Sequence, residues 1–227
     1  MSLHPRLRRF LREWSGTFVA ILVLMTFRSA VADWYDVPTG SMQPTILEGD
    51  RFLANKLAYG LDLPLVGTRV ATWAEPQRGD VVVFPSPTDG QRLIKRVVAV
   101  GGDTVAMRGG RLVLNGRPLA YTPAAAPDWP LPEDDTLAHR WYEEQLPGRA
   151  HPVMTTDARP SLRDWGPVRV PDGQLLVLGD NRDNSADGRV FGFVPAERIE
   201  ARAERVVLSV DRDRWWRPRW SRFGREL

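Results

Sequence analysis

Short apolar runs separated by turn residues dominate the chain after about residue 36. Runs rich in Val, Leu, Ile and Phe alternate with Gly, Pro and Asp, and helical periodicity is almost absent from this part. Runs of this length, bounded by turn signals, predict β-strands. The strands expected on this pattern are residues 81–84, 93–100, 111–114, 174–178 and 205–210.

The middle of the chain has a different character. Gly109-Gly110 and Asn115-Gly116 are hairpin turn signals, so residues 104–119 are expected to form a hairpin or a small meander. From about residue 120 to 171 the chain is rich in Pro, Ala, Asp and Trp and shows little alternation. This composition predicts an inserted, smaller subdomain over residues 104–171, with loops of its own.

The N-terminus combines arginines with an apolar run. Residues 17–27 carry no charge, and Trp14 and Trp34 bracket the stretch, roughly 30 Å apart if it is helical. This pattern predicts a basic cytoplasmic segment over residues 1–14, a transmembrane helix over 15–35, and an exported domain over 36–227. A cleavable signal peptide that ends at Ala30-Val31-Ala32 is the alternative. The remaining chain is exported on either interpretation.

Composition narrows the chemistry. A chain of 227 residues with 43% hydrophobic residues can bury the core of one domain. The absence of cysteine excludes disulfides, cysteine metal sites and thiol catalysis. The net charge of +3 fits a solvated surface or attraction to anionic lipid, and no nucleic-acid recognition motif accompanies it.

A loop over residues 179–195 is dense in Asp, Asn, Arg and Gly. Such a loop is typical of a cation site or of a web of side-chain hydrogen bonds. The calcium-loop spacing fits poorly, because no glutamate occupies the closing position. We therefore expect the hydrogen-bond web, and neither a metal nor a cofactor.

Lys95 stands out because only two of the 31 basic residues are lysines. In an extended strand it shares a face with Leu93 and Val97, so its amine emerges between aliphatic neighbours. Burial there disfavours the ammonium form and is expected to lower the amine pKa; a fall from about 10.4 to about 8 would correspond to about 3 kcal/mol of lost charge stabilisation. Arginine cannot supply a neutral base, because its guanidinium stays protonated in proteins.

Ser41 follows a glycine and lies between two prolines in V-P-T-G-S-M-Q-P-T, residues 37–45. A serine nucleophile needs a base, and the histidines are poor candidates. His4 lies on the cytoplasmic side of the predicted anchor, while His139 and His151 lie in the predicted insertion. The sequence therefore favours a serine–lysine dyad over a Ser-His-Asp triad.

Five segments closely resemble the ordered motifs of bacterial type I signal peptidases, also called leader peptidases. They are R-L-I-K-R-V-V at 92–98, the serine-bearing stretch at 37–45, the Asp-rich loop at 179–195, G-D-V-V-V-F at 79–84 and K-R-V-V-A-V-G-G-D at 95–103. The N-terminal anchor pattern agrees with the family as well. The resemblance implies that Ser41 is the nucleophile and Lys95 the general base. It also implies an oxyanion hole made by the Ser41 backbone N–H and the Thr39 hydroxyl, at a position where the family often has serine.

The same resemblance assigns roles in the Asp-rich loop. Ser185 matches a serine that orients the lysine, and Asp187 with Arg189 matches an ion pair that holds the loop. Gly188 departs from the serine sometimes found there. The fold implied is mainly β: a transmembrane helix followed by an exported antiparallel β-sheet catalytic domain with an inserted smaller subdomain.

The resemblance also implies a substrate and a place. A preprotein segment would lie extended between residues 36–39 and 91–95, and be cut after an Ala-x-Ala site. The partners implied are secretory preproteins and inner-membrane lipid, with proximity to the export machinery. The location implied is the inner membrane, single-pass, with the catalytic domain in the periplasm. The residues expected to line shallow apolar pockets are Val37, Pro38, Met42, Ile46 and Ile94.

Two alternatives stay open on the sequence alone. A specialised serine–lysine peptidase, such as one that matures a pilus subunit, would carry the same motifs. A non-catalytic, membrane-tethered β module that binds extended peptides would keep the fold but is expected to lose the dyad.

Overall fold

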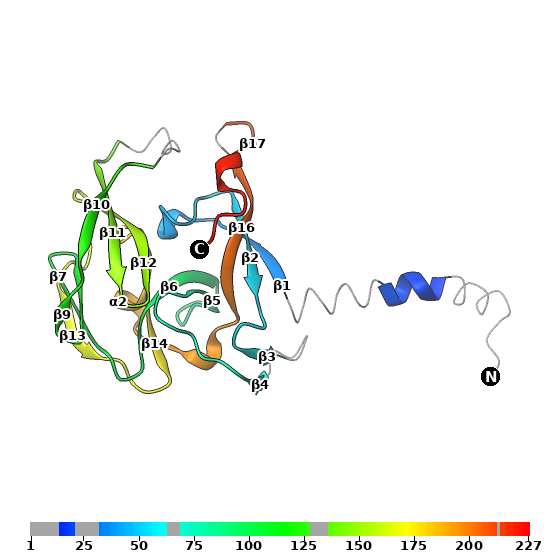
Figure 1. The fold of residues 1–227 in the computed structure, drawn as a ribbon, viewed down its shortest axis with the longest axis horizontal. Coiled ribbons are helices and arrows are strands. Elements are labelled where there is room, and N and C mark those ends of the chain that lie inside the picture. Colours follow the sequence, from blue (N-terminus) through cyan, green and yellow to red (C-terminus); the bar gives the residue numbers. More distant parts are fainter. Residues whose placement is uncertain (1–13, 21–31, 63–68, 128–135, 213) are drawn as a thin grey trace.

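The computed structural model describes residues 14–20, 32–62, 69–127, 136–212 and 214–227. An antiparallel eight-stranded sheet forms the main body, in the order β1-β2-β16-β5-β6-β14-β15, with β17 added beside β16 (Figure 1). The fold is mainly antiparallel β, as the apolar runs predicted. The strands of this sheet are β1 (Ala32–Asp36), β2 (Asp50–Asn55), β5 (Val81–Pro85), β6 (Arg92–Val100), β14 (Gln174–Leu178), β15 (Val194–Pro195), β16 (Ala201–Asp211) and β17 (Arg217–Pro218).

The predicted apolar runs all fall on observed strands. Those at 81–84, 93–100 and 174–178 form β5, β6 and β14, and the run at 205–210 lies within the longer β16. β6 is central, since it pairs with β5 along one edge and with β14 along part of the other. The remaining short elements of the main body are β3 (Gly60–Asp62), β4 (Arg69–Thr72), η1 (Gly40–Met42), α2 (Gly188–Phe191), η2 (Ala196–Arg198) and η3 (Trp220–Arg222).

Between β6 and β14 the chain builds two smaller sheets, drawn in green to yellow at one side of Figure 1. The predicted meander over 104–119 is confirmed, with Asn115 and Gly116 both at positive φ in the β8–β9 turn (51° and 77°), as a type I′ turn requires. The strands are β7 (Thr104–Arg108), β8 (Arg111–Leu114), β9 (Arg117–Pro118) and β13 (Trp165–Arg169) in one sheet, and β10 (Tyr121–Ala124), β11 (His139–Leu146) and β12 (Arg149–Thr156) in the other.

Residues 120–171 contain strands that the sequence pattern did not predict individually. β11 and β12 pair along their whole length, from His139 opposite Thr156 to Leu146 opposite Arg149. The apolar alternation is missing because the buried positions of this hairpin include Glu144 and His151. These side chains find polar partners inside the protein, so the hairpin buries a face that does not look apolar in the sequence.

The inserted sheets share a core with the main sheet. One apolar cluster joins Val98 of β6 and Leu176 of β14 to Val105, Met107 and Leu112 of the insertion. A second cluster, around Phe52, fills the space between β2, β5 and β16, and includes Val37 before Ser41 and Met42 directly after it. The catalytic candidates therefore lie in a body that the insertion helps to pack.

The N-terminal prediction needs a correction. Residues 14–20 are helical, but residues 21–31, which hold most of the predicted transmembrane helix, lie outside the described residues. Within the described part of the chain, no helix is long and apolar enough to cross a membrane. Trp34 does not end a helix, because residues 32–36 form β1, where Trp34 pairs with Leu53 and the Tyr35 ring lies 5.8 Å from that of Phe52.

Candidate active site

Ser41 lies in a single 3₁₀ turn, Gly40–Met42, between β1 and β2. Met42 is fully buried and anchors this turn in the apolar cluster around Phe52. Ser41 itself is 8% exposed, so most of the residue is shielded from water. The Ser41 hydroxyl is thus carried by a turn that is buried and rigidly packed.

The Lys95 amine lies against that hydroxyl. Its Nζ is 2.7 Å from Ser41 Oγ and donates a hydrogen bond to the carbonyl oxygen of Ile94 at 3.0 Å. Lys95 is 3% exposed, and this burial lowers the pKa of its amine to about 8. The carboxylates of Asp187 and Asp180 act weakly in the opposite direction. The structure therefore brings the two residues together, and the environment of the amine favours the neutral form.

Thr39 is the third group at this position. Its hydroxyl Oγ1 is 3.4 Å from Ser41 Oγ, and the residue is exposed at the mouth of the turn. The hydroxyl can rotate to donate to an oxygen bound beside Ser41. The Ser41 hydroxyl, the Lys95 amine and the Thr39 hydroxyl thus lie around one small volume.

The Asp-rich loop forms a hydrogen-bond web, as expected. Asp187 accepts a bond from Arg189 Nη2 at 2.8 Å and another from the backbone N–H of Gly179 at 3.0 Å. Arg189 in turn donates to the carbonyl of Arg182 at 2.6 Å. Among the described residues, no cluster of side chains suited to a metal ion is found.

Ser185 is brought close to the site but does not bond to the lysine. Its Oγ is buried and has no hydrogen-bond partner among the described residues. The loop packs tightly here: a Cβ on Gly179 would come within 2.3 Å of Ser185 Oγ and 2.5 Å of the Ser41 carbonyl oxygen. Only glycine at position 179 allows the loop to lie this close to the nucleophile.

A buried charged network beside the site was missed from the sequence. Arg96, next to Lys95, binds Asp180 through two nitrogens at 2.9 and 2.8 Å, and both side chains are at most 1% exposed. Burial alone would raise the pKa of Asp180, but Arg96 holds it below its ordinary value. The available signal was an arginine inside an otherwise apolar strand, which requires a partner when it is buried.

The network continues into the insertion. Arg182 binds Glu144 of β11 with two bonds, at 2.5 and 2.8 Å. His151 Nε2 lies 3.3 Å from Glu144 and 3.8 Å from Asp180. Burial lowers the His151 pKa to about 4, so this imidazole is neutral at ordinary pH. The hairpin β11–β12 is thereby connected to the strand that carries Lys95.

A pocket of about 220 Å³ runs between β1 and β6. Pro38 and Ile94 line it, as predicted, together with Tyr35 and Arg92, whose guanidinium lies 4.7 Å from the Tyr35 ring centre. The other predicted pocket residues are not at its surface: they are at most 1% exposed and pack in the cluster that supports the pocket floor. These residues are Val37, Met42 and Ile46.

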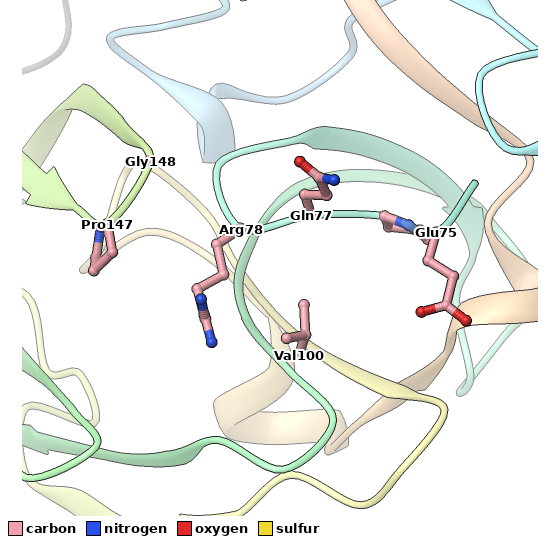
Figure 2. Close-up of a pocket in the computed structure, with 7 residues that line it drawn as sticks. Glu75, Gln77, Arg78, Val100, Pro147 and Gly148 are labelled. Carbon is pink, nitrogen blue, oxygen red and sulfur yellow. The ribbon is translucent and has the colours of Figure 1, made fainter.

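A larger pocket, of about 400 Å³, lies away from these residues (Figure 2). Arg78 and Gln77 border it on one side, and Pro147 and Gly148 of the β11–β12 turn on the other. The Arg78 guanidinium is already paired with Asp103, at 2.6 Å. Neither Ser41 nor Lys95 lines this pocket, so its size does not make it the candidate active site.

Comparison with known proteins gives a consistent result. A family model described as "Signal peptidase, peptidase S26" matches residues 11–208. A relative named Signal peptidase I from Pseudomonas fluorescens is 35% identical over 211 residues, covering 87% of this chain and 72% of the relative. Another, from Rickettsia akari, is 32% identical over 223 residues, covering 90% and 82%.

One solved structure resembles this chain in sequence but superposes on it poorly. It is described as a signal peptidase I from Enterococcus faecalis and is 28% identical, covering 58% of this chain and 98% of that one. Its TM-score of 0.34 is too low to support an argument about the fold.

Proposed function

Since the chain belongs to the signal peptidase family, peptidase S26, we propose that it removes signal peptides with Ser41 as nucleophile and Lys95 as general base. Family membership establishes the activity class, a serine endopeptidase of the signal peptidase I type. The observation that carries the residue assignment is the 2.7 Å distance between Ser41 Oγ and a buried lysine amine. A non-catalytic peptide-binding module would have no reason to maintain this pair.

The first half of the reaction uses the neutral amine. Lys95 takes the hydroxyl proton as Ser41 Oγ attacks the carbonyl carbon of the scissile bond. The tetrahedral oxyanion is stabilised by the Ser41 backbone N–H and the Thr39 hydroxyl. As the C–N bond breaks, the Lys95 ammonium gives its proton to the leaving amine, and the signal peptide remains as an ester on Ser41.

The second half repeats these steps with water. Neutral Lys95 takes a proton from water, which attacks the ester carbonyl, and the proton is then returned to Ser41 Oγ. The products are the signal-peptide carboxylate and the free enzyme. A pKa of about 8 suits a base that must be neutral before attack and charged after it.

The substrate is proposed to add as a strand between β1 and β6. Within the described chain, β1 pairs with β2 alone, and β14 pairs with β6 only from Arg96 onward, so residues 92–95 leave one strand edge open. Unpaired strand edges bind extended peptides through main-chain hydrogen bonds. The pocket lined by Pro38 and Ile94 lies beside this edge and can receive a substrate side chain. Cleavage after Ala-x-Ala sites is proposed from the resemblance to the family.

We also propose that the protein acts at the inner membrane, on the exported side and near the export machinery. The segment before β1, proposed as the anchor, carries the charge-free run 17–27. Trp34, Trp215, Trp216 and Trp220 are 57%, 92%, 63% and 72% exposed, and arginines surround the last three. Exposed tryptophan beside arginine is typical of a lipid headgroup interface.

The test is cleavage of a model preprotein by the full chain in lipid or detergent. We expect the wild type to cut once after an Ala-x-Ala motif, and Ser41→Ala to show no cleavage above background. Mass spectrometry of the products locates the cut. Equal cleavage by both proteins would remove Ser41 from the mechanism, and cleavage elsewhere would contradict the Ala-x-Ala assignment. A pilus-subunit precursor that is cut in preference to secretory preproteins would favour the specialised peptidase.

A further inference from the structure

The peptide bond between Gly40 and Ser41 is held from its carbonyl side. The Gly40 carbonyl accepts one hydrogen bond from the backbone N–H of Gln43 and a second from Asn181 Nδ2, each at 3.1 Å. Asn181 comes from the loop after β14 and is 1% exposed. Its backbone N–H also donates to the Ser41 carbonyl at 3.1 Å. One asparagine therefore holds the carbonyls on both sides of the nucleophile.

The geometry of a peptide bond gives this contact a consequence. The peptide unit is planar, so fixing the direction of the Gly40 carbonyl also fixes the direction of the Ser41 N–H. A hydrogen bond accepted by a carbonyl also polarises the same amide and strengthens its N–H as a donor. The Ser41 N–H is the proposed backbone donor to the oxyanion, and such donors act well only when they are oriented in advance.

We propose that Asn181 is a positioning residue of the reaction, whose side-chain amide orients the Gly40–Ser41 peptide and so aims the Ser41 N–H at the oxyanion. The inference rests on the proposed function, because it needs the oxyanion to form beside Ser41. Asn181 contacts neither the hydroxyl nor the Lys95 amine in any hydrogen bond of the described structure. Its effect is therefore indirect and separate from proton transfer.

Backbone contacts allow the side chain to be tested alone. The Asn181 N–H bond to Ser41 and the close approach of Gly179 to the Ser41 carbonyl do not depend on the Asn181 side chain. The loop should stay docked when the amide is removed. Asn181→Ala removes the donor, and Asn181→Leu removes it while keeping the branched outline of the side chain in a larger volume.

The experiment compares cleavage of the model preprotein by the full chain in lipid. Losing a whole oxyanion donor lowers turnover about a hundredfold to a thousandfold, and misaiming one should cost less. We expect Asn181→Ala and Asn181→Leu to lower kcat about tenfold to a hundredfold, with KM within about threefold. The pH at which kcat falls on the acidic side should stay the same, because these variants do not alter Lys95 or its hydrogen bonds.

Two controls separate orientation from general damage. Asn184, three residues later and exposed, bonds through its side chain to Arg159 and has no contact with the Ser41 turn, so Asn184→Ala should keep wild-type kcat. A peptide aldehyde, which forms a tetrahedral adduct with Ser41, should lose affinity in Asn181→Ala by about the same factor as kcat. An uncleaved peptide, measured in the Ser41→Ala background, should bind equally with and without the Asn181 change.

The outcomes discriminate between the two proposals. If Ser41→Ala still cuts the preprotein, the proposed function fails. If Ser41→Ala is inactive but Asn181→Ala retains wild-type kcat, only the positioning role fails. A shifted pH profile, equal losses of aldehyde and peptide binding, or failure of both Asn181 variants to fold would assign the residue a structural role and overturn the inference.

Discussion

Lys95 and Arg96 are buried neighbours on β6, and a carboxylate is bonded directly to Arg96 but not to Lys95. Both are buried, at 3% and 1% exposure. Arg96 is bound through two nitrogens by the Asp180 carboxylate and also donates to the Gly79 carbonyl. Among the described residues, the Lys95 amine forms hydrogen bonds with a hydroxyl and a carbonyl and with no carboxylate, and burial lowers its pKa to about 8.

Lys95 and Arg96 differ in whether a carboxylate is in direct contact with the side chain, and not in how deeply the side chain is buried. Asp180 and Asp187 both favour a charged Lys95, but each is in direct contact with an arginine, Arg96 or Arg189. The two arginines compensate most of the charge of these carboxylates, which leaves little net attraction for the Lys95 ammonium. One strand can therefore hold a permanent ion pair beside an amine of lowered pKa, provided that the carboxylates bind the arginines.

The largest expected effect comes from replacing Lys95 by arginine, so that positions 95 and 96 carry the same side chain. Lys95→Arg places a group at position 95 that cannot lose its proton, so it should lower kcat/KM at least about a thousandfold, close to the effect of Lys95→Ala. Preprotein cleavage measures this. Lys56→Arg is the matched control, because Lys56 is the other lysine and makes a surface ion pair with Asp33 at 3.5 Å. Substantial activity in Lys95→Arg would contradict the neutral-amine mechanism.

The next effect comes from removing the partner of Arg96. Asp180→Asn leaves the buried guanidinium without its carboxylate, which should lower the free energy of unfolding by about 3–5 kcal/mol. Urea denaturation followed by tryptophan fluorescence measures the loss. Glu200→Gln, which breaks the exposed pair with Arg92, should cost less than about 1 kcal/mol. Similar losses of unfolding free energy in Asp180→Asn and Glu200→Gln would show that the buried Arg96–Asp180 pair stabilises the fold no more than the exposed pair does.

The smallest effect is the dependence of activity on pH. The base must be neutral, so kcat/KM should fall on the acidic side of the Lys95 pKa, by about tenfold for each pH unit below about 8. The slope has this sign because protonation removes the lone pair that accepts the serine proton. In any Asp180→Asn protein that folds, the limb should move to lower pH, because Asp180 raises the pKa of Lys95. An acidic limb near pH 10 would show that the amine is not desolvated.

The aliphatic strands could be predicted from the sequence because their buried faces are apolar. β5, β6 and β14 are recognisable as runs of Val, Leu and Ile. β11 and β12 were not, since Glu144 and His151 occupy buried positions and are satisfied by groups from distant parts of the chain. Polar burial of this kind depends on partners that only the fold brings together.

The candidate site divides in the same way. Ser41 and Lys95, 54 positions apart, were predicted from motif order and from the rarity of lysine, and the structure places them in contact. The sequence did not predict the bonds from Asn181 to the Gly40 and Ser41 carbonyls, because an asparagine in a polar loop is indistinguishable from an ordinary turn residue. Ser185 shows the converse, since the predicted bond to the amine is absent although the side chain lies near the site.

The shared apolar cluster limits how the chain can be shortened. Val105, Met107 and Leu112 cover one face of the strands that hold Lys95 and the Asp-rich loop, so excising β7 to β13 would expose that face to water. A trimmed enzyme built on this chain for soluble assays must keep the meander and the β11–β12 ladder.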